Sequence, residues 1–299
     1  MGASLLRAVV VRRPTEYELL LAHHGTAGQA EFFLKSRGQT LRELYGVHTT
    51  IMSALEGVLA ALPSRWRRTT ISRDELARFL FEPDDVVIAV GQDGLVANVA
   101  KYLDGQLVVG INPNPQTIEG VLVAHPVAAA RDLLADIDAG RNLRVQSRTM
   151  VHAAMDDGQE LIALNEVFVG HRSHQSARYH IHFGGITEQH SSSGLICCTG
   201  TGATGWGLSL HRAMHIAAAM PGPSDPSLRF FVREAWSSKS SQAEVVSGEP
   251  TAQQPLRVTS QMNLGGVIFG DGIEEDYLSF EWGREVTIAP AQRHLRLVA

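Results

Sequence analysis

The stretch VVIAVGQDGLVANV, residues 86–99, decides the fold expected for the first half of the chain. Five apolar, mostly β-branched residues lead into GQDG at positions 91–94, and an apolar helical pattern begins at Leu95. This order predicts a buried strand, a tight glycine turn and the start of a helix. Glycines let a ligand approach the backbone, and the first N–H groups of a helix attract negative charge. We therefore predict a phosphate-binding turn.

Asp93 lies inside this turn and has two possible roles. A carboxylate beside a bound anion is unfavourable unless it binds a cation or takes a proton, which would make Asp93 catalytic. Alternatively, an aspartate in a turn caps the helix that follows. The local pattern leaves both roles open.

Composition and charge limit the classes of function. The 299 residues are 44% hydrophobic and carry a formal net charge of -5, which indicates a globular protein without a basic face for nucleic acid. Cys197 and Cys198 are adjacent, so a disulfide between them is not expected, and a reducing compartment is. We find no signal-peptide pattern and no apolar run of membrane-spanning length. These observations predict a cytoplasmic protein without membrane or nucleic-acid partners.

Strands and helices alternate in the first 142 residues. Strands are expected at residues 8–11, 17–22, 86–90 and 107–111. Helices are expected at residues 49–62, after the capping box Ser72-x-x-Glu75, and at residues 127–137. The alternation predicts a Rossmann-like α/β domain with a parallel sheet and a site at the carboxyl ends of its strands.

The second part of the chain, residues 143–299, has a different pattern. Short apolar runs broken by Gly, Ser, Asp and Pro predict strands at residues 144–154, 161–169, 177–183, 195–199, 228–232, 256–260, 266–270, 277–282 and 286–288. One helix is expected at residues 208–220, and the polar stretch 237–254 is expected to be a mobile loop. We predict a mostly β domain whose last residues pack back on the first domain.

Three other patterns have competing interpretations. The run GTGATG at residues 200–205 matches the dinucleotide fingerprint G-x-G-x-x-G, but no acidic residue ends a strand about twenty positions later, so a packing turn is an alternative. His180-x-His182 has a metal-ligand spacing, yet no further ligands complete a zinc site. Ser209 and His211 lack the G-x-S-x-G elbow of a hydrolase. A P-loop motif is absent from the sequence.

Three motifs in order resemble the NAD kinase family. GQDG at residues 91–94 resembles its GGDG signature, and Asn165-Glu166 resembles its NE signature. GLICCTGTGATGWGL at residues 194–208 resembles its GLIVSTPTGSTAYSL block, and GINPNPQTIEGVL at residues 110–122 is similar to the mitochondrial-type branch. The resemblance implies an α/β domain followed by a β-rich domain, as the patterns above predict.

The resemblance also implies a reaction and a set of site residues. ATP or a related donor, with Mg²⁺ or another divalent cation, would phosphorylate the 2′-hydroxyl of the adenosine ribose of NAD. Asp93 would activate that hydroxyl or orient the nucleotide, and Gly91, Gln92 and Gly94 would bind phosphate. The residues implied for substrate binding are Asn165, Glu166, Ser193, Thr201, Thr204, Gly205, Trp206 and Ser209. No metal-ligating residue is predicted, and a homo-oligomer formed through the β domain is implied.

Several positions depart from the family motifs. Gln92 replaces a glycine and adds a side chain where the backbone should lie close to phosphate. Ser193 stands where the family often has Asp, and Trp206 replaces Tyr, which keeps a stacking face but changes its size. Gly200, Ala203 and Gly205 replace Pro, Ser and Ala. Two alternatives therefore stay open, namely a kinase for another hydroxyl such as a sugar or nucleoside, and a nucleotide-binding sensor.

Overall fold

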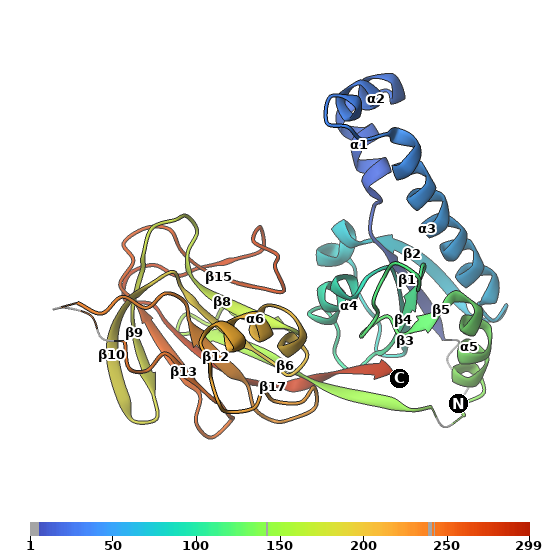
Figure 1. Cartoon of the computed structure of the whole chain (residues 1–299). Helices are drawn as coiled ribbons and strands as arrows, with labels where there is room; N and C mark the ends of the chain where they lie inside the picture. Colours follow the sequence, from blue (N-terminus) through green and yellow to red (C-terminus); the bar gives the residue numbers. More distant parts are fainter. Residues whose placement is uncertain (1–5, 142, 239–240, 242) are drawn as a thin grey trace. The chain divides into compact units, whose positions relative to one another are not determined.

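The computed structural model describes residues 6–141, 143–238, 241 and 243–299 (Figure 1). The chain divides into two compact units, residues 1–146 with 296–299 and residues 147–295. Two long strands, β6 (Val145–Met155) and β17 (Glu285–Val298), carry the chain across the boundaries of these units. The predicted boundary fell at position 142, which lies outside the described residues.

A parallel sheet forms the centre of the first unit. Its strands β1 (Arg7–Arg12), β2 (Arg67–Ser72), β3 (Asp85–Val90) and β4 (Leu107–Asn112) follow the order β4-β3-β1-β2. Strand β5 (His125–Pro126) and the end of β17 also pair with β4 in parallel. Every residue of β3 is buried. A strand covered on both faces explains the unbroken apolar run in the sequence.

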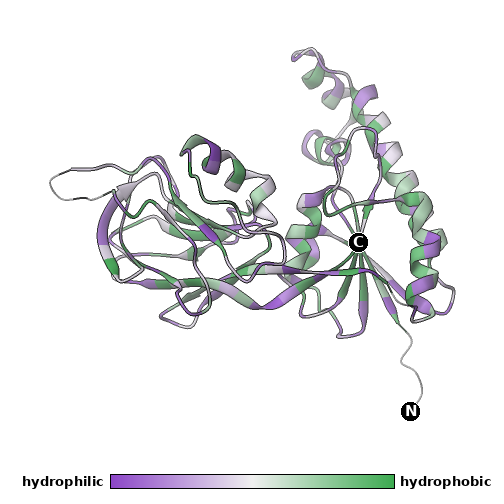
Figure 2. Cartoon of the chain, turned by 60° about the horizontal axis from the view of Figure 1, so that its bottom comes forward, coloured by the Kyte–Doolittle hydropathy of each residue, from purple (hydrophilic) through white to green (hydrophobic). Residues whose placement is uncertain are grey.

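Helices cover both faces of this sheet. On one face, α3 (Leu41–Ala61) and α5 (Ala130–Asp138), which follows the 3₁₀ turn η2 (Val127–Ala129), pack against alternate strand residues such as Val10 and Ile88. Helix α4 (Asp93–Ala100) contacts β1, β3 and β4 from the other face. In Figure 2, α3 carries both green and purple segments, as expected for a helix with one apolar and one polar face.

The sequence prediction was wrong for residues 17–22, and the helix at residues 27–35 was not predicted. The expected strand at residues 17–22 is part of helix α1 (Glu16–His24), and α2 (Ala27–Lys35) follows it. Thr15 and Glu18 form a capping box that starts α1, and Thr26 caps α2. These caps accept hydrogen bonds from the first N–H groups of each helix, which have no partner within the helix. Leucines also favour helix over strand.

Two other elements differ from the prediction in length, and one strand was not predicted. The Ser72–Glu75 capping box is confirmed, but it starts the short 3₁₀ helix η1 (Arg73–Arg78), and Leu80 beyond it is 86% exposed. Helix α6 (Trp206–Ala213) ends well before residue 220, close to His215, whose φ is 52°. Strand β10 (Ile186–Ser192) was not predicted because its sequence is polar.

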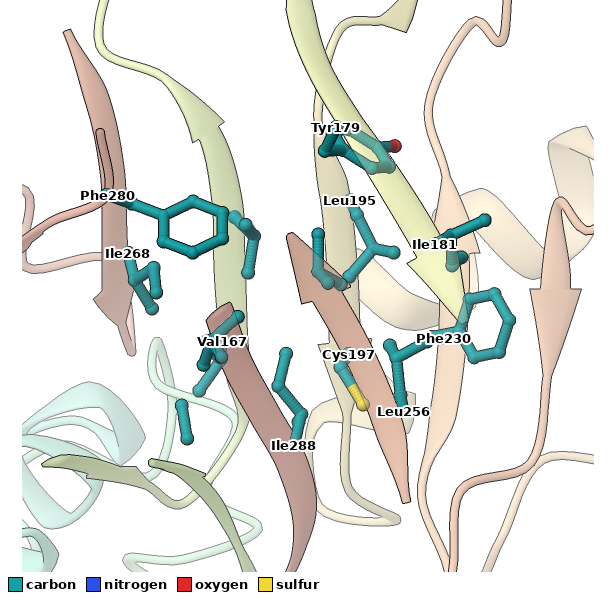
Figure 3. Packing of buried hydrophobic residues seen from close by; sticks show 14 of the residues in the cluster. Val167, Tyr179, Ile181, Leu195, Cys197, Phe230, Leu256, Ile268, Phe280 and Ile288 are labelled. Atoms are coloured by element: carbon teal, nitrogen blue, oxygen red, sulfur yellow. The ribbon is translucent and has the colours of Figure 1, made fainter. Parts of the chain in front are cut away.

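The second unit is a sandwich of two antiparallel sheets. One sheet contains β10, β9 (Ala177–Phe183), β14 (Leu256–Ser260) and β17, with β6 and β7 (Glu160–Ala163) beyond β17. The other has the order β13-β12-β11-β8-β15-β16, with bounds Ser247–Gly248, Arg229–Val232, Leu195–Cys198, Glu166–His171, Gly266–Gly270 and Leu278–Ser279. Figure 3 shows side chains of both sheets pointing toward one another, among them Ile181, Leu256, Val167 and Phe230.

An α/β unit followed by a β-rich unit confirms the predicted fold class. The predicted loop at residues 237–254 includes positions 239, 240 and 242, which lie outside the described residues. Both cysteines are free and buried. Over the described part of the chain, none of the helices is long and apolar enough to cross a membrane.

Candidate active site

The GQDG turn joins β3 to α4 in the predicted way. The N–H of Gly91 donates to the carbonyl oxygen of Ile111 (3.1 Å), which holds the turn beside the end of β4. Gln92 is the N-cap of α4, with φ −106° and ψ 166°, and its exposed side chain makes no capping hydrogen bond. Gln92 therefore fits the turn without backbone strain.

The carboxylate of Asp93 is directed to a neighbouring loop. Oδ2 accepts from the N–H of Val121 (2.9 Å), and Oδ1 accepts from those of Leu122 (2.8 Å) and Val123 (3.0 Å). The side chain therefore does not cap α4, and the capping interpretation of Asp93 was wrong. The three donors compensate the negative charge, so an anion could lie near this turn without a cation or proton on Asp93.

The loop that Asp93 holds has a second attachment at the end of β4. The side chain of Asn112 donates to the carbonyl oxygen of Ile118 (2.9 Å) and accepts from the N–H of Asn114 (2.9 Å). Gly110 lies directly against the backbone of Leu122, where a Cβ would overlap the carbonyl oxygen. Two polar side chains and one close backbone contact thus fix the loop.

Gly94 faces open space in the first turn of α4. A Cβ at this position would have no neighbour within 4 Å, whereas one at Gly91 would lie 3.2 Å from the side chain of Leu95. Within the described residues, no acceptor receives the N–H of Asp93 or Gly94. Free amides at a helix start, next to a glycine that the fold does not require, form a surface suited to an anion.

In the second unit, Asp271 holds the Asn165–Glu166 pair. Its carboxylate accepts from the N–H of Leu164 (2.9 Å) and Asn165 (2.7 Å), and its own N–H donates to the carbonyl oxygen of Glu166 (3.1 Å). Asp271 adopts a φ of 51°, which aspartate tolerates better than most residues. The backbone on both sides of Asn165 is therefore fixed in one conformation.

The Thr199–Gly202 turn lies directly beside this pair. The N–H of Thr199 donates to the carbonyl oxygen of Asn165 (2.9 Å), and its hydroxyl donates to that of Leu164 (2.6 Å). The same hydroxyl accepts from the N–H groups of Thr201 (3.1 Å) and Gly202 (3.3 Å). A Cβ at Gly202 would overlap the carbonyl oxygen of Asn165, so here the fold requires glycine. Residues 164–166 and 199–202 are far apart in the sequence, but these hydrogen bonds join them.

Glu166 is a partly buried carboxyl group. Burial, together with the nearby charge of Asp271, raises the pKa of Glu166 to about 7. Cys198 is the direct cross-strand partner of Glu166, and burial and the Glu166 charge raise the pKa of its thiol to about 12. Among the described residues, no side chain or N–H donates a hydrogen bond to the Glu166 carboxyl. This group is therefore available to a ligand and changes charge near neutral pH.

Trp206 lies over the same face of the sheet. Its ring is nearly parallel to that of Phe168 (centroid distance 6.3 Å, interplanar angle 9°), and Phe168 follows Glu166 by two residues on one face of β8. The guanidinium of Arg233 lies 5.3 Å from the centre of the Trp206 ring. Trp206 is 37% exposed. Its aromatic surface and the Glu166 carboxyl thus lie on one side of the second sheet.

The other predicted site residues are placed as follows. Thr201 is buried, and its hydroxyl accepts from Arg148 (3.4 Å), while the hydroxyl of Thr204 donates to the carbonyl oxygen of Thr201 (3.1 Å). Gly205 and Ser209 are exposed on the N-cap and body of α6. Ser193 precedes β11, whereas Thr199 follows it, so the length of this strand separates Ser193 from the Asn165–Glu166 pair.

Sequence reasoning did not identify three residues that organise these sites. Asn112, Arg148 and Thr199 are all buried and polar. Arg148 and Thr199 bond hydroxyl or backbone groups far away in the sequence, whereas Asn112 bonds the backbone of the nearby Asn114 and Ile118. A single buried polar residue does not produce a hydrophobic periodicity in the sequence, so pattern analysis does not find it. For Asn112, its position at the carboxyl end of a predicted parallel strand was the one usable indication.

A metal site at His180 and His182 receives no support among the described residues. In the part of the chain that the structure describes, no group of three or more His, Cys, Asp or Glu residues could hold a metal ion, and His182 instead hydrogen bonds Thr187 and Thr259. A surface hollow of about 610 Å³ between α1 and α2 is lined by none of the predicted site residues.

Comparison with known proteins finds similarity to NAD kinases. No family model matches the chain. It is 27% identical to NAD kinase 2, mitochondrial, of Rattus norvegicus, over 69% of this chain and 60% of that protein. The corresponding figures for NAD kinase 2, mitochondrial, of Homo sapiens are 26%, 69% and 58%. The chain thus spans about three fifths of the length of these relatives.

Two solved structures have the same fold. An NAD kinase from Archaeoglobus fulgidus, solved with ATP, has a TM-score of 0.61 at 16% identity and covers 98% of this chain and 93% of its own. Yeast NADH kinase, solved with NADH, has a TM-score of 0.61 at 13% identity, with coverage of 100% and 84%. These matches show that the chain has the fold of the two solved kinases, and the curated relatives show sequence similarity to NAD kinase 2.

Proposed function

We propose that the protein transfers the γ-phosphoryl group of ATP to the 2′-hydroxyl of the adenosine ribose of NAD. The oxygen of the hydroxyl would bond to the γ-phosphorus while the bond to ADP breaks. The proton of the hydroxyl would leave to solvent. A loose phosphoryl-transfer transition state needs positioning and charge stabilisation more than covalent help from the protein.

The main support is the start of α4. Free N–H groups of Asp93 and Gly94 lie beside a carboxylate whose charge three other amides already compensate. Gly94 adds no side chain that would keep a ligand away from these amides. We propose that Gly91, Gln92 and Gly94 bind the phosphates of ATP and that Asp93 orients them.

The second unit supplies groups suited to the acceptor. The Glu166 carboxyl could accept from ribose hydroxyls, and the Trp206 face could stack on a flat ring. We propose that Asn165, Thr201, Thr204, Gly205, Ser193 and Ser209 complete the binding of NAD. This assignment rests on the motif resemblance and on the shared structure of the Asn165 and Thr199 segments.

Mg²⁺ is proposed to arrive bound to the triphosphate. Among the described residues there is no carboxylate cluster for a protein-bound cation, and both Asp93 oxygens accept hydrogen bonds. Mg²⁺ commonly keeps several waters and takes ligands from substrate phosphates.

Incubation of the full chain with ATP, Mg²⁺ and NAD tests this proposal, with NADP measured by an NADP-specific dehydrogenase. A panel of NAD, NADH, sugars and nucleosides with labelled ATP separates the alternatives. NADP formation supports the proposal, whereas transfer only to another hydroxyl would favour the different acceptor that Gln92 motivates. Tight ATP or NAD binding without any transfer would favour a sensor.

Two further expectations stay predictions. Homo-oligomer formation through the β-rich unit is checked by light scattering coupled to size-exclusion chromatography. A cytoplasmic location is checked by cell fractionation, and the two mammalian relatives have mitochondrial in their names.

A further inference from the structure

We propose that Asp271 is a positioning residue of the proposed acceptor site, which holds the Asn165–Glu166 pair by its backbone and acts with its charge on the Glu166 carboxyl. The inference rests on the proposed function and deepens it, because Asp271 lies outside the predicted site. Asp271 directly follows β15, and the pairing of Gly270 with Val167 of β8 places it opposite Glu166. Its N–H continues this pairing by donating to the carbonyl oxygen of Glu166 (3.1 Å).

The backbone turns at Asp271, which directs its carboxylate toward the segment that enters β8. Asp271 and Gly272 both have a positive φ, 51° and 69°. In this conformation Oδ2 accepts from the N–H of Leu164 (2.9 Å), and Oδ1 accepts from that of Asn165 (2.7 Å). Hydrogen bonds to an ionised acceptor are stronger than those between neutral groups. One side chain therefore fixes the two residues that precede Glu166.

Asn165 is held by its backbone alone. Its N–H donates to Asp271, and its carbonyl oxygen accepts from the N–H of Thr199 (2.9 Å). Among the described residues, no group hydrogen bonds the amide of its partly exposed side chain. A fixed backbone with an available amide is a preorganised contact for a ligand, because binding then has to order less of the protein.

Several titratable or charged groups lie on the elements around Glu166. Cys198, its cross-strand partner on β11, is neutral at physiological pH, because burial and the Glu166 charge raise the pKa of its thiol to about 12. On α6, His211 and Arg212 lie in the last turn, away from the start of the helix. The other groups bond partners of their own: Arg229 on β12 with Glu249, Arg148 on β6 with Thr201, Glu160 on β7 with His152, and Tyr179 on β9 with Ser192. Burial and the charge of Asp271 are therefore what raise the pKa of Glu166 to about 7.

The charge of Asp271 thereby couples acceptor binding to pH. An ionised Glu166 is a stronger acceptor for a ribose hydroxyl than a neutral carboxyl group, so the affinity for NAD should rise as the pH rises through about 7. Without the Asp271 charge the pKa of Glu166 should be lower, although burial still keeps it above the ordinary value, and this rise should move to lower pH. Loss of the backbone hydrogen bonds alone would weaken binding without moving the rise.

The test compares the wild type, Asp271→Asn, Glu166→Gln and the double variant in the full chain. Asparagine also tolerates a positive φ, so Asp271→Asn keeps the turn. The control Glu275→Gln makes the same change from acid to amide at an exposed position of the same loop. The measurements are NAD affinity by calorimetry from pH 5 to 9, hydrogen exchange at the amides of Leu164 and Asn165, and kcat and KM for NAD and ATP.

We expect Asp271→Asn to speed exchange at both amides about tenfold and to weaken NAD binding at pH 9 about tenfold, since charge-assisted hydrogen bonds are lost. The rise in NAD affinity should occur at lower pH than in the wild type. The KM for NAD should rise more than kcat falls, with the KM for ATP nearly unchanged. When Glu166→Gln is present, Asp271→Asn should weaken NAD binding equally at every pH. Glu275→Gln should match the wild type in every measurement.

The proposal is overturned if Asp271→Asn leaves the NAD affinity as in the wild type at every pH. It is also overturned if the affinity falls while the pH of its rise stays the same, because Asp271 would then act only on the fold. Should Asp271→Asn not fold, NMR titration of the Glu166 carboxyl in the wild type decides, and an ordinary pKa there overturns the proposal. A wild type that binds NAD with this pH dependence but forms no NADP would contradict the proposed function and still support the role of Asp271.

Discussion

At the scale of single residues, Glu166 couples the site to pH. Its folded-state pKa of about 7 lies above the ordinary value, because burial and Asp271 oppose its ionisation. The protonated form therefore stabilises the fold, fully below pH about 4 and progressively less as the pH rises through 7. The Asp271 charge that contributes to this shift also fixes the backbone of Asn165.

We expect Glu166→Gln to remove this pH dependence. At pH 8 the variant should be more stable than the wild type by up to roughly 3 kcal/mol, and at pH 4.5 the two should be nearly equal. Urea denaturation at both pH values measures the free energy of unfolding. If the difference in free energy of unfolding between the wild type and Glu166→Gln is the same at the two pH values, the Glu166 pKa is not raised.

A second prediction at this scale concerns Gly94. Gly94→Ala places a methyl group in open space within a helix, where alanine is favoured by about 1 kcal/mol. The variant should therefore melt at or above the wild-type temperature, yet bind ATP more weakly. Thermal denaturation and ATP titration check the two effects, and unchanged ATP affinity would argue against phosphate contact at this glycine.

At the scale of elements, the contact between Gly202 and Asn165 joins two motifs. Gly202→Ala would push the Thr199 turn away from the carbonyl oxygen of Asn165. We expect a loss of stability of about 1–3 kcal/mol and a higher KM for NAD, with the KM for ATP nearly unchanged. Gly46→Ala in α3 is the control, because its Cβ meets no neighbour. Equal KM values for NAD in the wild type and Gly202→Ala would refute a shared acceptor site.

At the scale of the whole molecule, the two units have separate hydrophobic cores. Ile88 is fully buried in the first core, and Leu195 is fully buried in the second. We expect Ile88→Ala and Leu195→Ala each to cost about 2–5 kcal/mol and to lower different transitions in scanning calorimetry. A single transition that both variants lower equally would show instead that the units unfold together.

The sequence by itself determined the order of elements around residues 86–99, because β-branched runs, glycines and helical periodicity are local signals. It also located the three motifs. Local signals failed for α1, whose cap at Thr15 went unrecognised. Only the tertiary structure decided where the Asp93 carboxylate points and that Thr199 lies against Asn165. Those contacts join segments that are distant along the chain. Their partners are backbone groups, which almost every residue has, so the residue types in the sequence do not identify them.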